Sequence, residues 1–107
     1  MSKSNGMKFD DAKTRYDLIP PEALEQVARV LTFGAQKYDN DNWRKVKRKR
    51  RRYFAATMRH LWKWIGGERY DIETGLSHLA HAVCCILFML DMEDSVFGED
   101  ETNEEQR

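Results

Sequence analysis

The stretch from residue 60 to residue 81 holds most of the side chains whose type and spacing could carry chemistry. It reads HLWKWIGGERYDIETGLSHLAH. His78 and His81 are three residues apart, so on a helix they share one face and can converge on a single point. Three carboxylates and a third imidazole precede this pair: Glu68, Asp71, Glu73 and His60. Imidazoles beside carboxylates are typical of a divalent-metal site, and the oxygen donors favour Mg²⁺ or Mn²⁺.

A structural role for the same residues is an open alternative. A histidine on a half-buried helix commonly hydrogen-bonds a backbone carbonyl in the core, and Asp71 or Glu73 can cap the helix that follows. No paired-cysteine motif supports zinc, and no adjacent His-Asp doublet supports an HD-type phosphohydrolase site. The spacing is compatible both with a metal site and with a structural cluster.

A second candidate lies at residues 34–44, which read GAQKYDNDNWR. Lys37 and Arg44 can hold phosphate oxygens, and Tyr38 or Trp43 can stack on a base. The alternative is that the two aromatic rings fill the end of a helical bundle. The chain contains neither GxxxxGK[ST] nor GxGxxG, so a nucleotide here would be bound by helices and side chains.

A third candidate is the basic run Lys45 to Arg52, with seven cations in eight residues. Such a run attracts nucleic acid or phosphate. The alternative, a solvated face that offsets an acidic segment, is favoured over duplex binding because no groove-reading motif follows the run. Nucleic-acid binding is therefore a possible role for this chain and not the favoured one.

Apolar residues around these candidates recur at helical spacing and predict three helices. The first begins at Pro21 and fades near Tyr38, and the second is clearest from Tyr53 to Ile65, where Gly66 and Gly67 stop it. The third runs from about Ser77 to Met92. Turn-forming residues 39–43 and the short acidic connector 68–75 join them. The fold class is all-α.

The third helix predicts an assembly. Nearly every position from Leu79 to Leu90 is apolar, and a helix that is apolar all round must be buried all round. Two partner helices in so small a chain cannot cover it, so we expect a small helical bundle completed by homo-oligomerisation, as a homodimer or homotetramer.

The chain has 107 residues, enough for one domain. We expect a flexible N-terminus at residues 1–7, a helical domain at 8–94 and an acidic, disordered tail at 95–107. The zero net charge hides an asymmetry: residues 1–52 carry fourteen basic and seven acidic side chains, and residues 53–107 carry four and eleven.

Compartment and membrane expectations follow from the same composition. The longest purely apolar run, Ala82 to Leu90, has nine residues, about half of what a membrane span requires. Residues 1–15 lack the apolar stretch of a signal peptide, and the adjacent Cys84 and Cys85 suit buried free thiols. These features predict a cytoplasmic protein without a membrane span.

The order of motifs carries a family resemblance. KFDDAKTRYDLIPPEAL, then GAQKYDNDNWR, then RRYFAATMRHLWKWIGGERYDIETGLSHLAHAVCCILFML resembles the phage-encoded dATP/dGTP diphosphohydrolase family, the MazZ-type relatives of MazG-like all-α nucleotide pyrophosphohydrolases. The likeness covers about residues 8–92. It departs from the expected pattern at Ala12 and Asp39, where glycine is expected, and at HLAH, where ExxD is expected.

The resemblance implies an oligomeric helical hydrolase, cytoplasmic in a phage-infected bacterium. It would cut a purine deoxynucleoside triphosphate (dGTP or dATP) to the monophosphate and pyrophosphate with Mg²⁺ or Mn²⁺, and so shape the phage nucleotide pool. The implied catalytic residues are Glu68, Asp71 and His60. The implied substrate-binding residues are Lys37, Tyr38, Asn42, Trp43, Arg44, Arg59 and Trp64. The implied metal ligands are Glu68, Asp71, His78 and His81. The alternative function is a non-enzymatic protein that sequesters a nucleotide or a cyclic nucleotide signal.

Overall fold

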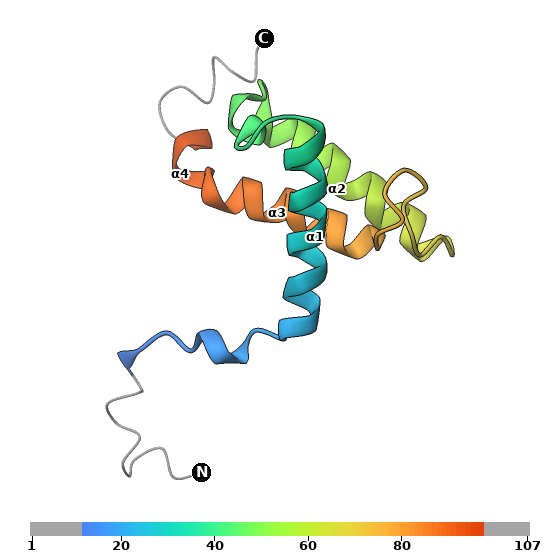
Figure 1. Cartoon of the computed structure of the whole chain (residues 1–107). Helices are drawn as coiled ribbons and strands as arrows, with labels where there is room; N and C mark the ends of the chain where they lie inside the picture. The colour runs from blue at the N-terminus through green and yellow to red at the C-terminus, as the bar shows by residue number, and fades with distance from the viewer. Residues whose placement is uncertain (1–11, 98–107) are drawn as a thin grey trace.

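Three long helices make up most of the described chain, which is residues 12–97 of a computed structural model (Figure 1). They are α1 (Pro21–Lys37), α2 (Lys49–Ile65) and α3 (His78–Asp91). Three short helical segments accompany them: η2 (Tyr16–Leu18), η3 (Asn42–Lys45) and α4 (Glu93–Val96). Residues 12–97 contain no β-strand, which confirms the all-α prediction. Within the same residues, no helix is long and apolar enough to cross a membrane.

The helix ends follow local chemistry. Pro21 occupies the first position of α1, where its missing N–H costs no hydrogen bond. At the end of α2, the N–H of Gly66 donates to the carbonyl of Trp62, and Gly67 takes a φ of 107° that strains any other residue. At the start of α3, the hydroxyl oxygen of Ser77 accepts the N–H of Leu79 at 3.1 Å. The predicted helices are confirmed, with α2 beginning four residues before its clearest stretch.

The core lies where α3 meets the other two long helices. Val27 of α1 packs with Ala80 and Cys84 of α3, and Val30 and Phe88 pack against this group. Ala80 and Cys84 are one turn apart and small, so α1 can approach α3 closely. The thiol of the buried Cys84 donates to the carbonyl oxygen of Val27 at 3.4 Å, which ties the two helices together.

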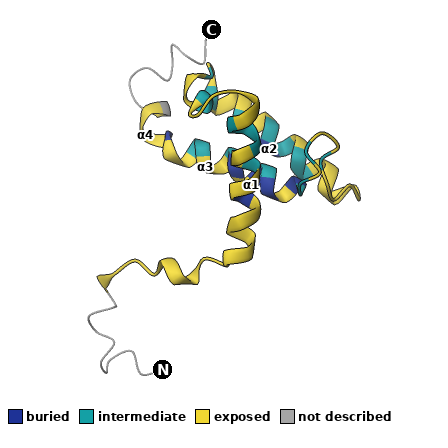
Figure 2. Cartoon of the chain, viewed as in Figure 1, coloured by how far each residue is buried: buried dark blue, intermediate teal, exposed yellow. Residues whose placement is uncertain are grey.

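The outer face of α3 is not covered. Five of its apolar side chains are between 38% and 63% exposed: Leu79, Val83, Ile86, Leu87 and Leu90. The buried residues of α3, which are His78, Ala80, Ala82 and Cys84, all lie in its N-terminal half, where it passes α1 (Figure 2). This agrees with the expectation that two partner helices in one chain cannot cover the apolar third helix, because α1 and α2 together pack against only part of its circumference.

The two ends of the described chain differ from each other. Met92 is buried and leads into α4, so the predicted tail at residues 95–107 begins inside a short helix. The predicted flexible residues 1–7 and the rest of the tail, residues 98–107, lie outside the described residues. At the other end, η2 lies apart from the three long helices (Figure 1), and its Tyr16 is 76% exposed.

Replacing Ser77 with alanine tests the cap that starts α3. The variant lacks the acceptor for the N–H of Leu79, so we expect the free energy of unfolding to fall by about 1 kcal/mol. Urea denaturation followed by far-ultraviolet circular dichroism measures this loss. Ser77→Thr keeps a hydroxyl and should retain most of the stability, and an alanine variant as stable as the wild type would contradict the cap.

Candidate functional site

The packing of α2 on α3 brings three imidazoles together. The two helices run antiparallel, since Tyr53 contacts Phe88 while His60, further along α2, contacts His81. His60 Nδ1 lies 2.9 Å from His78 Nδ1, and the rings of His60 and His81 stack with their centroids 4.7 Å apart. His78 is fully buried, so each of its ring nitrogens needs a partner inside the protein.

Glu68 supplies the second partner of His78. Its Oε2 lies 2.6 Å from His78 Nε2, so that nitrogen carries the proton and donates it to the carboxylate. His78 Nδ1 is then the unprotonated nitrogen and accepts from His60 Nδ1–H. Because a carboxylate fixes this tautomer, the lone pair of His78 Nδ1 is directed to the side of His60, as in a metal-ligating histidine oriented by an outer carboxylate.

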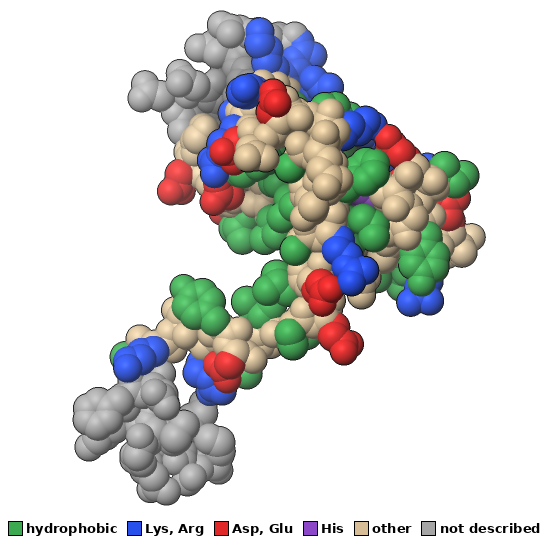
Figure 3. Space-filling model, in the orientation of Figure 1, with side chains coloured by type: hydrophobic (Ala, Val, Ile, Leu, Met, Phe, Trp, Pro, Cys, Tyr) green, Lys and Arg blue, Asp and Glu red, His purple; other side chains and the backbone are tan. Residues whose placement is uncertain are grey.

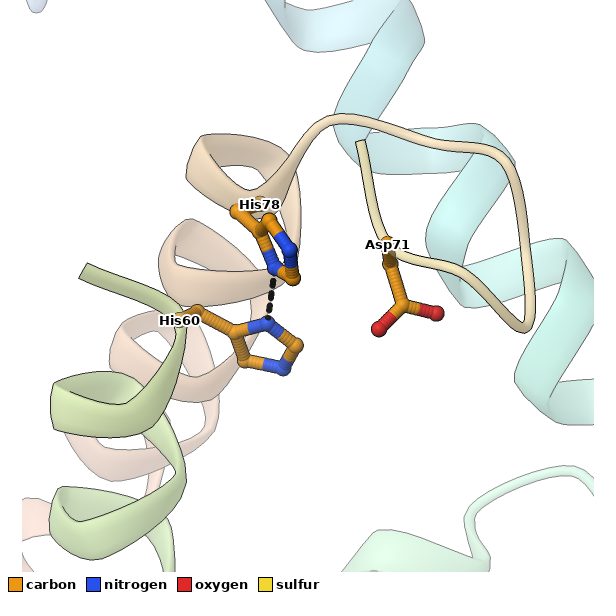
Figure 4. A group of neighbouring side chains, drawn as sticks. All are labelled: His60, Asp71 and His78. Atoms are coloured by element: carbon orange, nitrogen blue, oxygen red, sulfur yellow. Dashed lines mark hydrogen bonds between the residues drawn. The ribbon is translucent and has the colours of Figure 1, made fainter. Parts of the chain in front are cut away.

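The connector between α2 and α3 holds Asp71 in place. Asp71 Oδ2 accepts the backbone N–H groups of Glu73 and Thr74 at 3.1 and 3.0 Å. The Thr74 hydroxyl lies 2.7 Å from His81 Nε2, which ties the connector to α3. Gly75 permits the turn with a φ of 70°. In Figure 4 the Asp71 side chain, on the connector, lies across from the imidazoles of His60 and His78.

His60, Asp71 and His78 form the candidate metal cluster. One ligand atom from each lies within 4.8 Å of the others. Two imidazole nitrogens and a carboxylate oxygen suit first-row divalent ions such as Mn²⁺, whereas Mg²⁺ prefers oxygen ligands throughout. The residues present therefore fit a divalent cation that takes the place of the hydrogen bond between His60 and His78, and of the two predicted ions they fit Mn²⁺ better.

The protonation states also suit metal binding. Burial lowers the pKa of His60 to about 4, and the neighbouring His81 and His78 add to the effect. Burial likewise lowers the pKa of His81. Burial alone would raise the pKa of Asp71, but the backbone N–H of Thr74, the positive form of His81 and further hydrogen bonds outweigh it and lower the pKa. At neutral pH, His60 is neutral and Asp71 is ionised, as a bound cation requires.

A cavity of about 850 Å³ opens beside this cluster. It lies among the C-terminal half of α1, the loop that follows, the start of α2 and the middle of α3, with His81 and Thr74 on its wall. Apolar and aromatic side chains line much of it, including Phe33, Val46 and Phe88. The volume falls within the range of about 300 to 1,000 Å³ typical of small-molecule sites.

Four of the seven predicted substrate-binding residues line this cavity: Lys37, Tyr38, Asn42 and Trp43. The remaining three, Arg44, Arg59 and Trp64, are not among its lining residues. Lys37 forms an ion pair with Glu73 of the connector. Tyr38 is 58% exposed, so its ring is accessible to a ligand.

Trp43 is packed into the protein. Phe88 stacks on its ring with centroids 4.5 Å apart, and the guanidinium carbon of Arg44 lies 4.2 Å from the ring centroid. Tyr53 also donates its hydroxyl to the Trp43 carbonyl oxygen at 2.8 Å. With these contacts Trp43 helps to close one end of the helical packing, and Tyr38 is the better placed of the two for stacking on a base.

The predicted metal ligands divide into two groups. Asp71 and His78 belong to the cluster, together with His60, which the sequence placed among the catalytic residues. Glu68 and His81 instead contact members of the cluster, Glu68 through a hydrogen bond and His81 through ring stacking. The spacing placed His78 and His81 on one face of a helix, and both rings do contact His60 of α2, but it did not show which of them would join the cluster.

Several residues of the site were not predicted. Tyr53 and Phe88 close the end of the cavity around Trp43, and Thr74 joins the connector to His81. Tyr53 lies two helical turns before His60, so its position on the same face of α2 was a signal that it faces α3. No sequence pattern pointed to Phe88 or Thr74, because their contacts depend on the axial position of α3 relative to α2.

The basic run Lys45–Arg52 lies away from the cluster, at the start of α2. Basic side chains gather at that end of the molecule in Figure 3. Arg50 lies over the ring of Phe97, with its guanidinium carbon 4.5 Å from the ring centroid. Val46 lines the cavity, so the run begins at the cavity wall.

Fold and site together describe a small helical protein with a histidine and carboxylate cluster beside a cavity of the size typical of small-molecule sites. The family model of the dATP/dGTP diphosphohydrolase N-terminal domain matches residues 3–102, and the chain belongs to this family. It is 42% identical over 84 residues to a protein of Salmonella phage PMBT28 named dATP/dGTP diphosphohydrolase. That match covers 78% of this chain and 28% of the phage protein, so the chain spans under a third of its relative. No solved structure matches.

The lowered pKa of His60 predicts a pH-dependent stability. His60 stays neutral in the folded chain down to about pH 4, whereas in the unfolded chain it binds a proton below its ordinary pKa of 6.5. The free energy of unfolding should therefore fall as the pH drops from 6.5 to 4. Urea unfolding at a series of pH values, with a chelator present, measures the slope.

The variant His60→Asn isolates this contribution. It removes the titrating ring, so we expect a shallower slope, with part of it retained because the pKa of His81 is lowered too. A lower stability at every pH is also expected, because the contact with His78 is lost. An unchanged slope would contradict the assignment of this pH dependence to His60.

Proposed function

We propose that this chain binds and hydrolyses purine deoxynucleoside triphosphates, dGTP or dATP, as a metal-dependent diphosphohydrolase. The observation that carries the proposal is the cluster His60, Asp71 and His78 beside a cavity of nucleotide size. The family of the chain and the name of its phage relative support the same reaction. The enzyme would be a hydrolase acting on an acid anhydride, releasing the monophosphate and pyrophosphate.

In the proposed reaction, a water oxygen attacks the α-phosphorus. The bond from that phosphorus to the oxygen bridging to the β-phosphorus breaks, and its electron pair leaves with pyrophosphate. A divalent cation bound at the cluster would offset the phosphate charge and lower the pKa of water. Mn²⁺ is the preferred candidate and Mg²⁺ the second, for the reasons of donor chemistry given above.

Side chains of the protein would hold the base at one end of the substrate and the phosphates at the other. The base would lie in the cavity against Tyr38, and the phosphates would extend towards His81 and the connector. Lys37 lines the cavity and would contact a phosphate oxygen once released from Glu73. Glu68 would act through His78, by holding the tautomer whose Nδ1 lone pair faces the cluster.

The biological role we propose follows from the substrate. Hydrolysis of dGTP and dATP lowers their concentrations and raises those of the monophosphates, which would reshape the nucleotide pool of a phage-infected bacterium. Free deoxynucleotides are found in the bacterial cytoplasm, so the protein would act there.

We also propose that the chain works as a homo-oligomer, through the outer face of α3. The apolar side chains left exposed there include Val83 and Leu90, and the described chain buries few large apolar side chains of its own. A domain of this size with so small a core gains stability when a second copy covers such a face. A homodimer is the minimum, and a homotetramer would use a further face.

Replacing Asp71 with alanine tests the catalytic proposal. The variant loses the carboxylate of the cluster, so we expect turnover of dGTP and dATP to fall by at least about 100-fold, with the helical circular dichroism retained. Ion-exchange chromatography of the nucleotides measures turnover in the presence of Mn²⁺. Glu22→Ala, in the first turn of α1, is the matched control and should keep full activity.

Two outcomes would contradict the catalytic proposal. If Asp71→Ala hydrolyses both nucleotides at the wild-type rate, the cluster is not the catalytic site. If the wild type binds dGTP or dATP tightly and releases no product with any metal, the alternative of a sequestering protein is supported instead.

The proposed assembly is tested with Val83→Glu. A charge on the outer face of α3 should shift the protein towards the monomer, because burying an unpaired carboxylate is costly. Light scattering after size-exclusion chromatography gives the mass. Ile72→Glu places the same charge on an exposed apolar residue of the connector and should leave the mass unchanged. A wild type that is monomeric at high concentration would contradict the proposal.

A further inference from the structure

The acidic side chains on the cavity wall differ in whether they already form a hydrogen bond or an ion pair within the protein. Three line the cavity: Asp39, Asp41 and Glu73. Glu73 pairs with Lys37, and Asp41 lies 3.5 Å from the guanidinium of Arg44. The Asp39 carboxylate makes no hydrogen bond or ion pair with any described residue. It is therefore the one acidic group, among the described residues of this wall, that is free to accept from a ligand.

The position of Asp39 is set by the backbone around it. Its carbonyl oxygen accepts the N–H of Asn42 at 3.1 Å, which closes a turn between α1 and η3. Tyr38, the residue before it, also lines the cavity and is more than half exposed. Tyr38 and Asp39, which are consecutive in the chain, thus both border the cavity, and they offer it an aromatic ring and a free carboxylate, the two groups that a pocket needs to stack on a base and read its edge.

A carboxylate distinguishes the two purines. Guanine presents two donors side by side, N1–H and N2–H₂, and the two oxygens of a carboxylate can accept both. Adenine has a lone pair at N1 and only a C–H at position 2, so the same carboxylate meets an acceptor. The amides of Asn40 and Asn42, also on this wall, carry both donors and acceptors and can pair with either base.

We propose that Asp39 reads the base edge in this cavity and selects guanine over adenine. This inference rests on the proposed function for the identity of the ligands, and it adds a specificity-determining residue to the same cavity. It predicts that dGTP is the better of the two substrates, and that the preference is lost with the charge of Asp39.

The test compares wild type, Asp39→Asn and Asp41→Asn. The values of kcat/KM for dGTP, dATP and dITP are measured with Mn²⁺, and equilibrium dissociation constants for dGMP and dAMP are measured by calorimetry on the same proteins. Asp41→Asn is the matched control, because it makes the same change two residues away in a carboxylate that lies against Arg44. Deoxyinosine triphosphate keeps N1–H and lacks the N2 amino group.

The kcat/KM of the wild type should be about 10- to 100-fold higher for dGTP than for dATP, because only guanine makes the charge-assisted hydrogen bonds to the carboxylate. The value for dITP should lie between the two. Asp39→Asn should lower that ratio by at least about 10-fold, mainly through dGTP, while Asp41→Asn changes it less than about twofold. The calorimetric preference for dGMP over dAMP should fall in parallel.

Failure of this inference can be told apart from failure of the proposed function. If both triphosphates are hydrolysed and Asp39→Asn leaves their ratio unchanged, Asp39 does not read the base, although the proposed function stands. A wild type that prefers dATP also overturns the inference. If no triphosphate is hydrolysed, the function fails, and the calorimetric ratio alone decides the role of Asp39: equal ratios in wild type and Asp39→Asn overturn it.

Discussion

The contact between His60 of α2 and the buried His78 of α3 is the constraint on which the rest of the site depends. A fully buried imidazole whose nitrogens lack partners is costly, so His78 requires both His60 and Glu68. Glu68 lies just after α2 and His78 begins α3, so the connector must turn back sharply between them. That turn is the one that directs Asp71 towards the imidazoles. The hydrogen bonds that the buried His78 ring requires therefore also bring the residues of the cluster together.

The small side chains in the core around α3 also help to form the site. Ala80 and Cys84 let α1 come close, and the C-terminal half of α1 then forms a wall of the cavity beside the cluster. Large side chains at these two positions would push α1 away and open the cavity. The cost is that the chain buries little apolar volume on its own, and the outer face of α3 is left exposed.

Much of the fold could be predicted from the sequence, because helical periodicity and end signals such as Pro21, Gly66 and Ser77 are local. The residues of the site were predicted as a region, and their arrangement was not. Both His78 and His81 contact His60, and which of the two hydrogen-bonds to it depends on the register of α2 against α3, which no local pattern records. Trp43 was predicted either to stack on a base or to fill the end of the bundle, and its contact with Phe88, a residue far away in the chain, fits the second role. The prediction that α3 is buried all round depends on a second copy, which a single chain does not contain.

In the proposed reaction, the cluster beside the cavity supports attack of water on the α-phosphorus of a purine deoxynucleoside triphosphate. The most direct measurement is to incubate the protein with dGTP and Mn²⁺ in ¹⁸O-labelled water, and to analyse the products by mass spectrometry. We expect dGMP that carries one ¹⁸O atom, with unlabelled pyrophosphate. Label in pyrophosphate would place the attack on the β-phosphorus, and intact dGTP or a dGDP product would contradict the claim outright.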